Sequence, residues 1–410
     1  MAFMAGNITA LLSIKIKARH DDYTDQVSRI VVVKIFIVSS LVMGVDFFHD
    51  TISCIPPVHK DKAQIIPPKF IQSACWIKGF YVYPDLEIQN SVYYGIPTTL
   101  INDGTSSIDS EPCATKGVFL QSRKKQTHCV PLKKRFMRQY QWMPFFIASM
   151  ALLFYMPYII FRVVNTDMIS LRANINDQVD RDLIVQNYFN HSINSVPKMR
   201  MRVFMNFIIK LLYVLVNVVS FLVLNASLDN TFYTYGQQWM EWTRLNSTMQ
   251  LEYELRDTPL PSNRMLPSFG ICDISDSRSD ISSTYVNKVS MICEISSHVL
   301  YHYLFLIFWF VLVLSITVSI IGVILNIFGH VNNMKFSRHR DSSKLIYQHL
   351  TIRECEYLEF IRRRNLALYG LVITKLKEIK VKNHVLNGLT SHRRSRQGSD
   401  EELNSLKDSL

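Results

Sequence analysis

The chain has 410 residues, of which 48% are hydrophobic and 12% are aromatic, with a net charge of +12 and a mean hydropathy of +0.10. This composition is too apolar for an ordinary soluble enzyme of this length. A positive charge is also typical of nucleic-acid-binding proteins, but here the basic residues lie outside the apolar runs and concentrate in the tail. Orientation in a membrane therefore explains the charge, and we expect no nucleic-acid partner.

The N-terminal segment, residues 1–29, is amphiphilic and is expected in the cytoplasm. It lacks the basic start and cleavage site of a signal peptide. Its apolar residues recur at near-helical spacing, which predicts one apolar stripe. Such a stripe is typical of an interfacial helix lying on the bilayer, and it also fits a segment that lines a pore; the sequence leaves both open. The stripe consists of Phe3, Met4, Ile8, Leu11, Leu12 and Ile16.

The first predicted span covers residues 30–48 and contains Lys34 and Asp46. A charge inside a span costs about 2.5–3.5 kcal/mol on insertion scales. Because both residues lie near an end of the span, we expect their side chains to snorkel to the interface. The alternative is that they face a protein or water interior.

The first long loop, residues 49–138, combines folded and flexible pieces. Residues 63–83 are apolar enough to fold compactly, whereas residues 100–112 have the Gly, Ser and Asp content of a flexible insertion. Cysteines in one polar loop indicate disulfides and therefore an oxidising compartment. They are Cys54, Cys75, Cys113 and Cys129.

The second predicted span, residues 139–162, includes 21 residues from Gln141 to Phe161 without a formal charge. About 20 apolar residues are needed to cross a hydrocarbon core. Pro144 and Pro157 would cost a soluble helix about 3 kcal/mol each in its interior, but spanning helices tolerate proline because neighbouring helices satisfy the freed carbonyls. A membrane span is therefore favoured over the alternative, a buried helix of a large soluble protein.

The remaining chain contains two further predicted spans. In the third, Lys210 and Asn217 are seven residues apart and share one helical face, which predicts a polar stripe that points into a bundle. Asn217 fits a packing hydrogen bond between helices better than an ion ligand. The predicted segments are a cytoplasmic loop 163–202, the third span 203–224, a second outer loop 225–302, the fourth span 303–328 and a cytoplasmic tail 329–410.

Four spans place both termini on one side, and the distribution of charge indicates that this side is the cytosol. The tail carries 16 Lys and Arg, residues 163–202 carry 5 and the N-terminal segment carries 4. Seven basic residues between Arg123 and Arg138 argue the other way. However, six of the seven cysteines fall in the two outer loops and only Cys355 lies inside, which matches the redox compartments.

Several motifs then resemble the innexins, the gap-junction proteins of invertebrates, over about residues 10–370. The start of the second span resembles the family's YYQWV-P signature, with Gln139 and Met143 as departures from it. The residues that match this signature are Tyr140, Gln141, Trp142 and Pro144. The segment Leu266–Asp273 resembles the family's sequence before the first cysteine of the second loop. Acidic residues before the first span also match, although Gln26 stands where the family commonly has Arg.

The resemblance implies an all-α membrane protein of four transmembrane helices, two disulfide-bonded extracellular loops with a small α+β cap, and a helical cytoplasmic domain. It implies bridges of Cys54 with Cys293 and of Cys75 with Cys272. Cys113 and Cys129 exceed the family's usual number and would pair locally, as a staple for an insertion or as part of a new docking feature. From the sequence alone, six cysteines permit 15 connectivities.

The function that this resemblance implies is a subunit of a gap-junction channel in the plasma membrane at cell–cell contacts. Partners would be further copies of the chain, other innexins, the docking hemichannel of the adjacent cell and membrane lipids, with about eight subunits per hemichannel by analogy. Met4, Asn7 and Leu11 would line a constriction of the pore. The alternatives are an undocked hemichannel that releases ions and metabolites, and a non-conducting four-span adhesion protein.

Motifs of enzymes and of metal sites are absent from the sequence, so we expect no catalysis, cofactor or metal. His191, His298 and His302 are expected to be structural. Asn246 begins an acceptor pattern for N-glycosylation in the second outer loop, and a glycan there would favour the undocked state. In the tail, Arg362–Arg364 would contact anionic lipid or form a solvated helix face.

Overall fold

The computed structural model describes most of the four predicted spans and parts of the loops between them. The chain divides into two compact units, and each is described by itself. Of the described residues, one unit contains Ser28–Phe154 and Val216–Thr317, and the other contains residues 23–27, Tyr155–Leu215 and residues 318–379. The described residues are 23–49, 52–55, 67–86, 94–97, 105–107, 113–115, 118–120, 130–177, 180–251, 259–280, 283–339 and 350–379.

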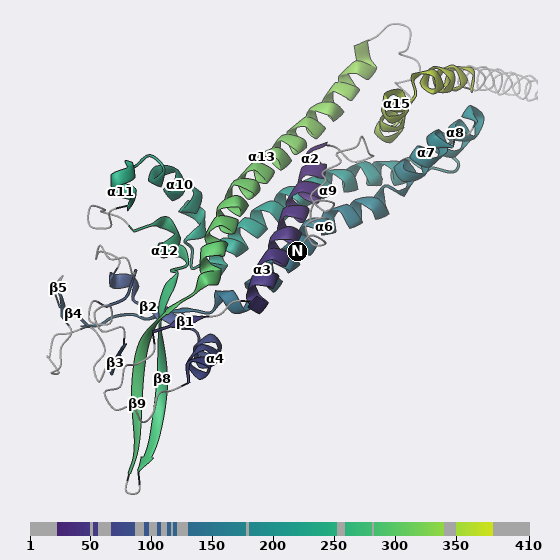
Figure 1. Cartoon of the computed structure of the whole chain (residues 1–410). Coiled ribbons are helices and arrows are strands. Elements are labelled where there is room, and N and C mark those ends of the chain that lie inside the picture. Colours follow the sequence, from purple (N-terminus) through teal and green to yellow (C-terminus); the bar gives the residue numbers. More distant parts are fainter. Residues whose placement is uncertain are drawn as a thin grey trace, which may run out of the picture. The chain divides into compact units, whose positions relative to one another are not determined.

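Among these residues, four helical segments are long and apolar enough to cross a membrane, and each contains most or all of one predicted span. They continue past the predicted spans because helical hydrogen bonding does not stop where the hydrocarbon ends. The first consists of a short α2, a π-helical turn η1 and α3 (Figure 1). The bounds are α2 Tyr23–Gln26, η1 Val27–Val32, α3 Val33–His49, α6 Gln139–Val164, α9 Val196–Ser227 and α13 Ser296–His339.

Aromatic packing joins the helices of the first unit. The ring of Phe36 in α3 is stacked on that of Phe308 in α13, with centroids 4.6 Å apart, and lies 5.4 Å from the ring of Phe154 in α6. All three side chains are buried. The hydroxyl of Ser40 also donates to the carbonyl of Pro144 at 2.9 Å. The first, second and fourth helices are therefore in direct contact within this unit.

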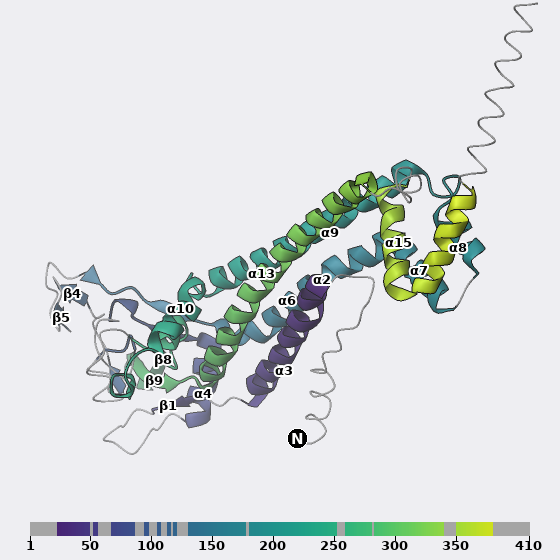
Figure 2. The same cartoon turned by 90° about the horizontal axis from the view of Figure 1, so that it is seen from above.

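A six-stranded antiparallel sheet lies in the described part of the two outer loops. Its longest strands, β8 and β9, form one hairpin that Figures 1 and 2 show beside α4. The strand order is β1-β9-β8-β2-β7, with β3 also paired to β9. The bounds are β1 Ser53–Cys54, β2 Phe80–Val82, β3 Thr105–Ser107, β7 Arg135–Met137, β8 Phe269–Asp280 and β9 Ser283–Glu294.

The sheet draws its strands from both loops, and one side of it is apolar. Tyr81 of β2 pairs with Ile271 of β8, which in turn pairs with Ile292 of β9. These residues form a buried cluster with Tyr83, Leu86, Ile96 and Leu132. The expectation of a flexible insertion at residues 100–112 was wrong for residues 105–107, because these pair with β9 over three residues.

Smaller elements complete the first unit. A second, three-stranded sheet has the order β5-β4-β6, and short helices accompany the loops. The bounds are α4 Pro68–Lys78, η2 Pro84–Leu86, β4 Cys113–Thr115, β5 Val118–Leu120, β6 Val130–Pro131, α10 Phe232–Trp242, α11 Ser247–Leu251 and α12 Pro261–Met265.

The second unit contains a helical domain formed by the segment after α6 and by the tail. Its helices are α7 Thr166–Asn176, α8 Arg181–Tyr188, α15 Ile352–Arg364 and residues 366–379. Thr351 and Glu354 form a capping box at the start of α15, which satisfies free backbone N–H groups of its first turn. Tyr357, Leu358 and Ile361 of α15 are buried in one apolar cluster with Leu171, Ile184 and Val372.

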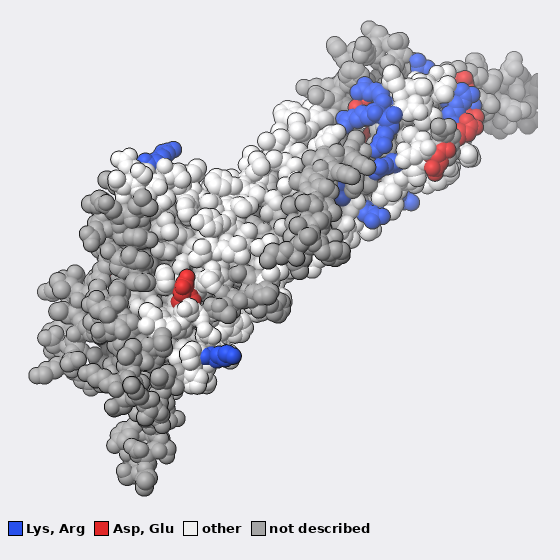
Figure 3. Space-filling model, in the orientation of Figure 1, with Lys and Arg blue, Asp and Glu red and all other residues white. Residues whose placement is uncertain are grey.

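Charged side chains are unevenly distributed over the visible face of the molecule. In Figure 3, the surface along the long helices is mostly uncharged, and Lys, Arg, Asp and Glu gather over α7, α8 and α15. Many apolar side chains of the long helices are exposed, for example Leu152 at 75%, Leu314 at 61% and Phe328 at 60%. Such a band is what a lipid-facing or subunit-facing surface requires.

Candidate functional site

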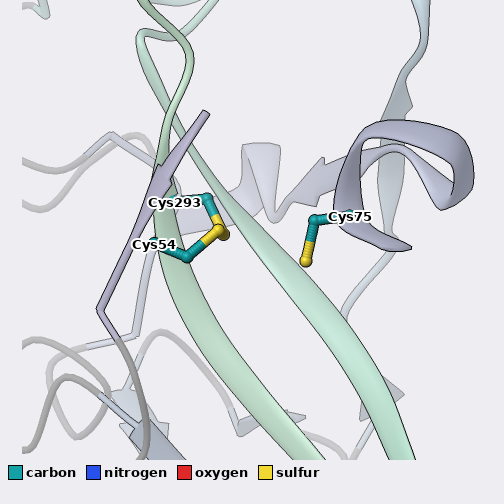
Figure 4. A group of neighbouring side chains, drawn as sticks. All are labelled: Cys54, Cys75 and Cys293. Carbon is teal, nitrogen blue, oxygen red and sulfur yellow. A yellow bond between two sulfur atoms is a disulfide. The ribbon is translucent and has the colours of Figure 1, made fainter. Parts of the chain in front are cut away.

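Two disulfides join the two outer loops. Cys54 of β1 is bonded to Cys293 of β9, 239 residues later in the chain, and the two residues are partners in the sheet register (Figure 4). Cys75 of α4 is bonded to Cys272 of β8. These are the pairings that the family resemblance implies. Because each bridge closes a loop of about 200 residues or more, both restrict the unfolded chain strongly.

The sulfur atoms of Cys54, Cys75 and Cys293 lie within 4.8 Å of one another. This spacing is compatible with a metal site only if the sulfurs are thiolates, since the thiolate is the metal ligand. Here all three belong to disulfides. They therefore form a covalent core for the sheet. Of the predicted extra pair, Cys113 has a described backbone in β4, and Cys129 lies outside the described residues.

The helix α4 carries Cys75, and particular residues of the sequence start and end this helix. Pro67 and Pro68 start it, and proline is favoured in the first turn, where its missing N–H is not needed. Gly79 ends it with a φ of 88°, a conformation that glycine adopts without strain. The chain then turns directly into β2. The Cys75–Cys272 bridge consequently fixes α4 on β8.

A buried polar cluster lies beside this bridge. The carboxylate of Asp273 accepts hydrogen bonds of 2.7 Å from the hydroxyls of Tyr81 and of Ser290. Lys78 donates to the backbone carbonyl of Asp273 at 2.7 Å. Burial raises the pKa of Tyr81, and the charge of Asp273 raises it further, so this hydroxyl remains a donor. The cluster connects α4, β2, β8 and β9 with directional bonds.

Two of the signature residues at the start of α6 contact the disulfide-bonded helix α4. The hydroxyl of Tyr140 and the side-chain amide of Gln141 both donate to the carbonyl of Trp76, each at 2.6 Å. Trp76 is the residue after Cys75, so these bonds tie the second span to the disulfide-bonded helix. Trp142 is 38% exposed. Pro144 contributes its carbonyl to Ser40, as described above.

The start of α13 is tied to Leu266–Asp273, the second segment that resembles the family. Nδ1 of His298 lies 2.8 Å from the carbonyl of Pro267, and Nε2 of His302 contacts that of Leu266. The hydroxyl of Tyr235 in α10 donates to the carbonyl of His302 at 3.0 Å. Both imidazoles are buried and bonded to backbone. Their environment fits the structural role expected from the sequence.

Polar side chains of the spans meet in the bundle interior. In the first unit, Asn217 donates to the hydroxyl of Ser28 at 3.0 Å, and that hydroxyl lies 3.0 Å from Oγ of Ser315. Asn217 thus makes the inter-helix packing hydrogen bond that its position predicted. In the second unit, Nζ of Lys210 lies 2.7 Å from the carboxylate of Asp25. The sequence placed Lys210 in a polar stripe but did not identify Asp25 as its partner.

Sequence reasoning also missed a charged cluster in the second unit. The carboxylate of Asp167 in α7 accepts hydrogen bonds from Arg353 at 2.8 and 3.1 Å, from Arg202 at 2.9 Å, and from Tyr357. Burial would raise the pKa of Asp167, but bonding to Arg353 outweighs it and lowers the pKa below its ordinary value. No spacing motif reveals this cluster, because Asp167 and Arg353 are separated by 186 residues.

The other predicted site residues divide into described and undescribed positions. Asn246 is exposed at the end of the turn between α10 and α11, where a glycan would find space. Lys34 is partly buried, and the side chain of Asp46 is not among those described. The proposed pore-lining residues Met4, Asn7 and Leu11 lie outside the described residues.

Four apolar helices carrying a covalently cross-linked outer sheet define a multi-pass membrane protein whose two outer loops fold as one module. The family model "Innexin" matches residues 21–391 of the chain, and the chain belongs to the innexin family. Innexins form oligomeric gap-junction channels and hemichannels and are not enzymes, which makes this protein a member of a channel family of the plasma membrane. A comparison with curated proteins found no match.

Proposed function

We propose that the chain is the subunit of a gap-junction channel that passes ions and small molecules between adjacent cells through two docked hemichannels. The observation that carries this proposal is the rigid outer module. A surface that is ordered before it meets its partner loses less entropy on docking. The Cys54–Cys293 and Cys75–Cys272 bridges supply this order.

The contacts between module and spans support the proposal further. Tyr140 and Gln141 bind the second span to α4, and His298 and His302 bind the fourth span to the segment before β8. A docking surface attached in this way at two spans keeps a defined orientation to a pore that those spans would surround. We propose assembly with further copies or with other innexins, on the order of eight subunits by family analogy, with Met4, Asn7 and Leu11 at a constriction.

The second candidate is an undocked hemichannel that releases ions and metabolites. Asn246 favours it, because the side chain is exposed and begins an acceptor pattern for a bulky glycan. A non-conducting adhesion protein would need the same rigid module. It would not need polar side chains inside the spans, such as the Lys210–Asp25 pair.

The experiment is to express the chain alone in oocytes and to record junctional conductance between paired cells and membrane current in single cells. The docked channel predicts junctional current, and current in single cells alone would favour the hemichannel. Silence in both, with the protein detected at the surface, would contradict homomeric conduction. Co-expression with a second innexin would then separate an obligatory partner subunit from the adhesion protein.

A further inference from the structure

A small open cavity lies where the outer sheet meets the start of the second span. Its volume is about 340 Å³, and its described lining consists of four neighbouring side chains. Phe136 is part of β7, Arg138 connects β7 to α6, and Gln139 and Trp142 belong to the first residues of α6. All four lie in the first unit. The sheet and the span therefore share this cavity.

The cavity lies at the end of the span, where lipid headgroups are found. Arg138 is the last charged residue before the apolar run, and the next one is Arg162. Trp142 is 38% exposed and Phe136 is 57% exposed. Tryptophan at the end of a span settles at the membrane–water interface, because its ring is apolar and its N–H is polar. This position therefore combines exposed apolar rings with a cation at the depth of phospholipid phosphates.

The guanidinium of Arg138 supplies the charge of the cavity. Its side chain is exposed, and within the described part of the chain no group accepts a hydrogen bond from it or forms an ion pair with it. Arg135, three residues earlier in the same basic stretch, is instead paired with Asp229 at 2.8 Å. The stem of Arg138 lies against Gly79, where a Cβ atom would be only 3.0 Å from Cγ of the arginine. A guanidinium placed in this way offers two parallel N–H donors to phosphate oxygens.

The side-chain amide of Gln139 provides a second donor. This residue lines the cavity although it is only 8% exposed. Its Oε1 accepts a hydrogen bond of 3.0 Å from the backbone N–H of Arg138, and its Nε2 has no acceptor among the described residues. Buried N–H groups are normally satisfied by protein, by water or by a ligand. The Gln139 amide is therefore available to a ligand oxygen beside the guanidinium. Gln139 is also one of the departures from the family's signature, in which a tyrosine stands at this position.

We propose that this cavity binds the phosphodiester headgroup of a phospholipid in the membrane leaflet next to the outer sheet. The guanidinium of Arg138 and the amide of Gln139 hold phosphate oxygens, and the described lining contains no carboxylate that would repel them. Trp142 and Phe136 contact the glycerol and the first acyl carbons. A soluble anion would use only the polar half of this lining, whereas a lipid uses both halves.

A lipid at this position connects two parts of the first unit. Phe136 lies in β7, which pairs with β2 in the outer sheet, and Trp142 lies in α6. The bound lipid therefore adds a contact between the outer module and the second span. This binding does not depend on whether the protein conducts or docks, so its test is independent of the proposed function.

The binding test uses the full chain purified in detergent, with native mass spectrometry of the adducts formed on adding dioleoylphosphatidylcholine. Arg138→Gln is expected to weaken the tightest adduct by about tenfold or more, because hydrogen bonds to charged groups are the strong ones. Gln139→Tyr keeps the charge but removes the amide and fills part of the cavity, and it is expected to weaken the adduct by about fivefold. Wild-type affinity in both variants would overturn the proposal.

The matched control is Lys133→Gln. Lys133 is exposed and belongs to the same basic stretch, but it does not line the cavity. This variant loses the same charge as Arg138→Gln and is expected to bind the lipid as the wild type does. A loss in Lys133→Gln equal to that in Arg138→Gln would show that only the general positive charge of the stretch attracts lipid, which would contradict a defined site.

Two further probes separate the phosphate from the rest of the lipid. Dioleoylglycerol has the same acyl chains without a phosphate, and inorganic phosphate has no chains. The wild type is expected to bind dioleoylphosphatidylcholine more tightly than dioleoylglycerol, and this preference should disappear in Arg138→Gln. Equal binding of the two lipids by the wild type would overturn the recognition of phosphate. Inorganic phosphate that displaces the lipid at millimolar concentration would instead identify a site for a soluble anion and overturn the assignment to lipid.

Melting temperatures in detergent distinguish a ligand-binding role of Arg138 from a structural one. A ligand that binds only the folded chain raises its stability. Added dioleoylphosphatidylcholine is therefore expected to raise the melting temperature of the wild type and of Lys133→Gln more than that of Arg138→Gln. Without added lipid, the wild type and Arg138→Gln should melt together, because the Arg138 side chain is exposed. A lower melting temperature of Arg138→Gln without lipid, and an equal rise with lipid, would make the arginine merely structural and refute the site.

Discussion

The hydroxyl of Tyr140, the second residue of α6, donates a hydrogen bond to the carbonyl of Trp76 in α4 at 2.6 Å. The preceding residue, Cys75, is bonded to Cys272. A residue of the second span is thus hydrogen-bonded to the neighbour of the cystine that fixes α4 on the long hairpin. This continuity makes the orientation of the outer module sensitive to the Cys75–Cys272 bridge.

We predict that Cys75→Ala abolishes intercellular coupling. Loss of a native disulfide from a small extracellular module typically costs 2–5 kcal/mol of folding free energy, and here it also releases α4. The measurement is dye transfer and junctional conductance between paired cells that express only the variant. Cys355→Ala is the control, because Cys355 lies in α15 and is not disulfide-bonded. Normal dye transfer with Cys75→Ala would refute the role of the module.

Asp167→Asn is predicted to destabilise the second unit. The change removes the buried carboxylate that Arg353 and Arg202 share and leaves Arg353, which is 1% exposed, with Glu356 as its acidic partner. Breaking a buried pair costs about 3–5 kcal/mol, and the remaining contact with Glu356 places the expected loss at the lower end of that range. Asp182→Asn, in an exposed pair with Lys375, should cost no more than about 1 kcal/mol. Thermal unfolding of both variants at pH 7 checks the difference, and equal melting temperatures would contradict it.

The same variant has a predicted pH dependence. The pKa of Asp167 in the folded chain lies below its ordinary value of 3.8. Its contribution to stability is therefore fully present above about pH 4 and is lost as the pH falls through the folded value. The difference in unfolding free energy between the wild type and Asp167→Asn should stay constant from pH 7 to pH 5 and shrink below pH 4. A difference that shrinks already near pH 6 would point to another group.

Gly236→Ala is predicted to destabilise the first unit. A Cβ atom on Gly236 would lie 2.2 Å from Cε3 of Trp309, a buried ring whose Nε1 donates to the carbonyl of Tyr233 at 3.1 Å. Overpacking of this kind costs about 1–3 kcal/mol. Gly370→Ala is the matched control, since a Cβ there meets nothing within 4 Å and alanine should add about 0.5–1 kcal/mol of helix stability. Opposite shifts in melting temperature are expected, and shifts of the same sign would be inconsistent with the packing described.

Thr248→Ala is predicted to remove a glycan from Asn246, whereas Thr248→Ser keeps the acceptor pattern. Both Asn246 and Thr248 are exposed. The wild type and Thr248→Ser should therefore migrate more slowly on a gel than Thr248→Ala, and glycosidase treatment should abolish the difference. If Thr248→Ala also raises junctional conductance, the glycan restrains docking. Identical mobility of all three untreated proteins would show that the position is unoccupied.

Local sequence predicted the positions of the spans, but it did not predict the partners of the polar side chains within them. The apolar runs predict four spans, and the structure has four helices long and apolar enough to cross a membrane in its described part. The signature at Tyr140 resembles the family, but its contact with Trp76 cannot be read from the sequence. The periodicity that placed Lys210 and Asn217 on one face gave no information on their partners, Asp25 and Ser28. The strand at Thr105–Ser107 was missed because a polar, glycine-containing segment becomes a strand when a neighbouring strand offers hydrogen bonds.

Local composition was enough to predict a multi-pass membrane protein, because the hydrophobic effect acts within a short stretch of chain: about 20 apolar residues predict a membrane span wherever they stand. The sequence also narrowed the cysteine pairing through family resemblance. Which distant groups meet depends on the folded chain: no sequence pattern joined Asp167 to Arg353, and the Cys75–Cys272 bridge was implied by the family resemblance alone. These contacts join residues about 190 positions apart or more, and their energies depend on distance and burial, which exist only once the chain has folded.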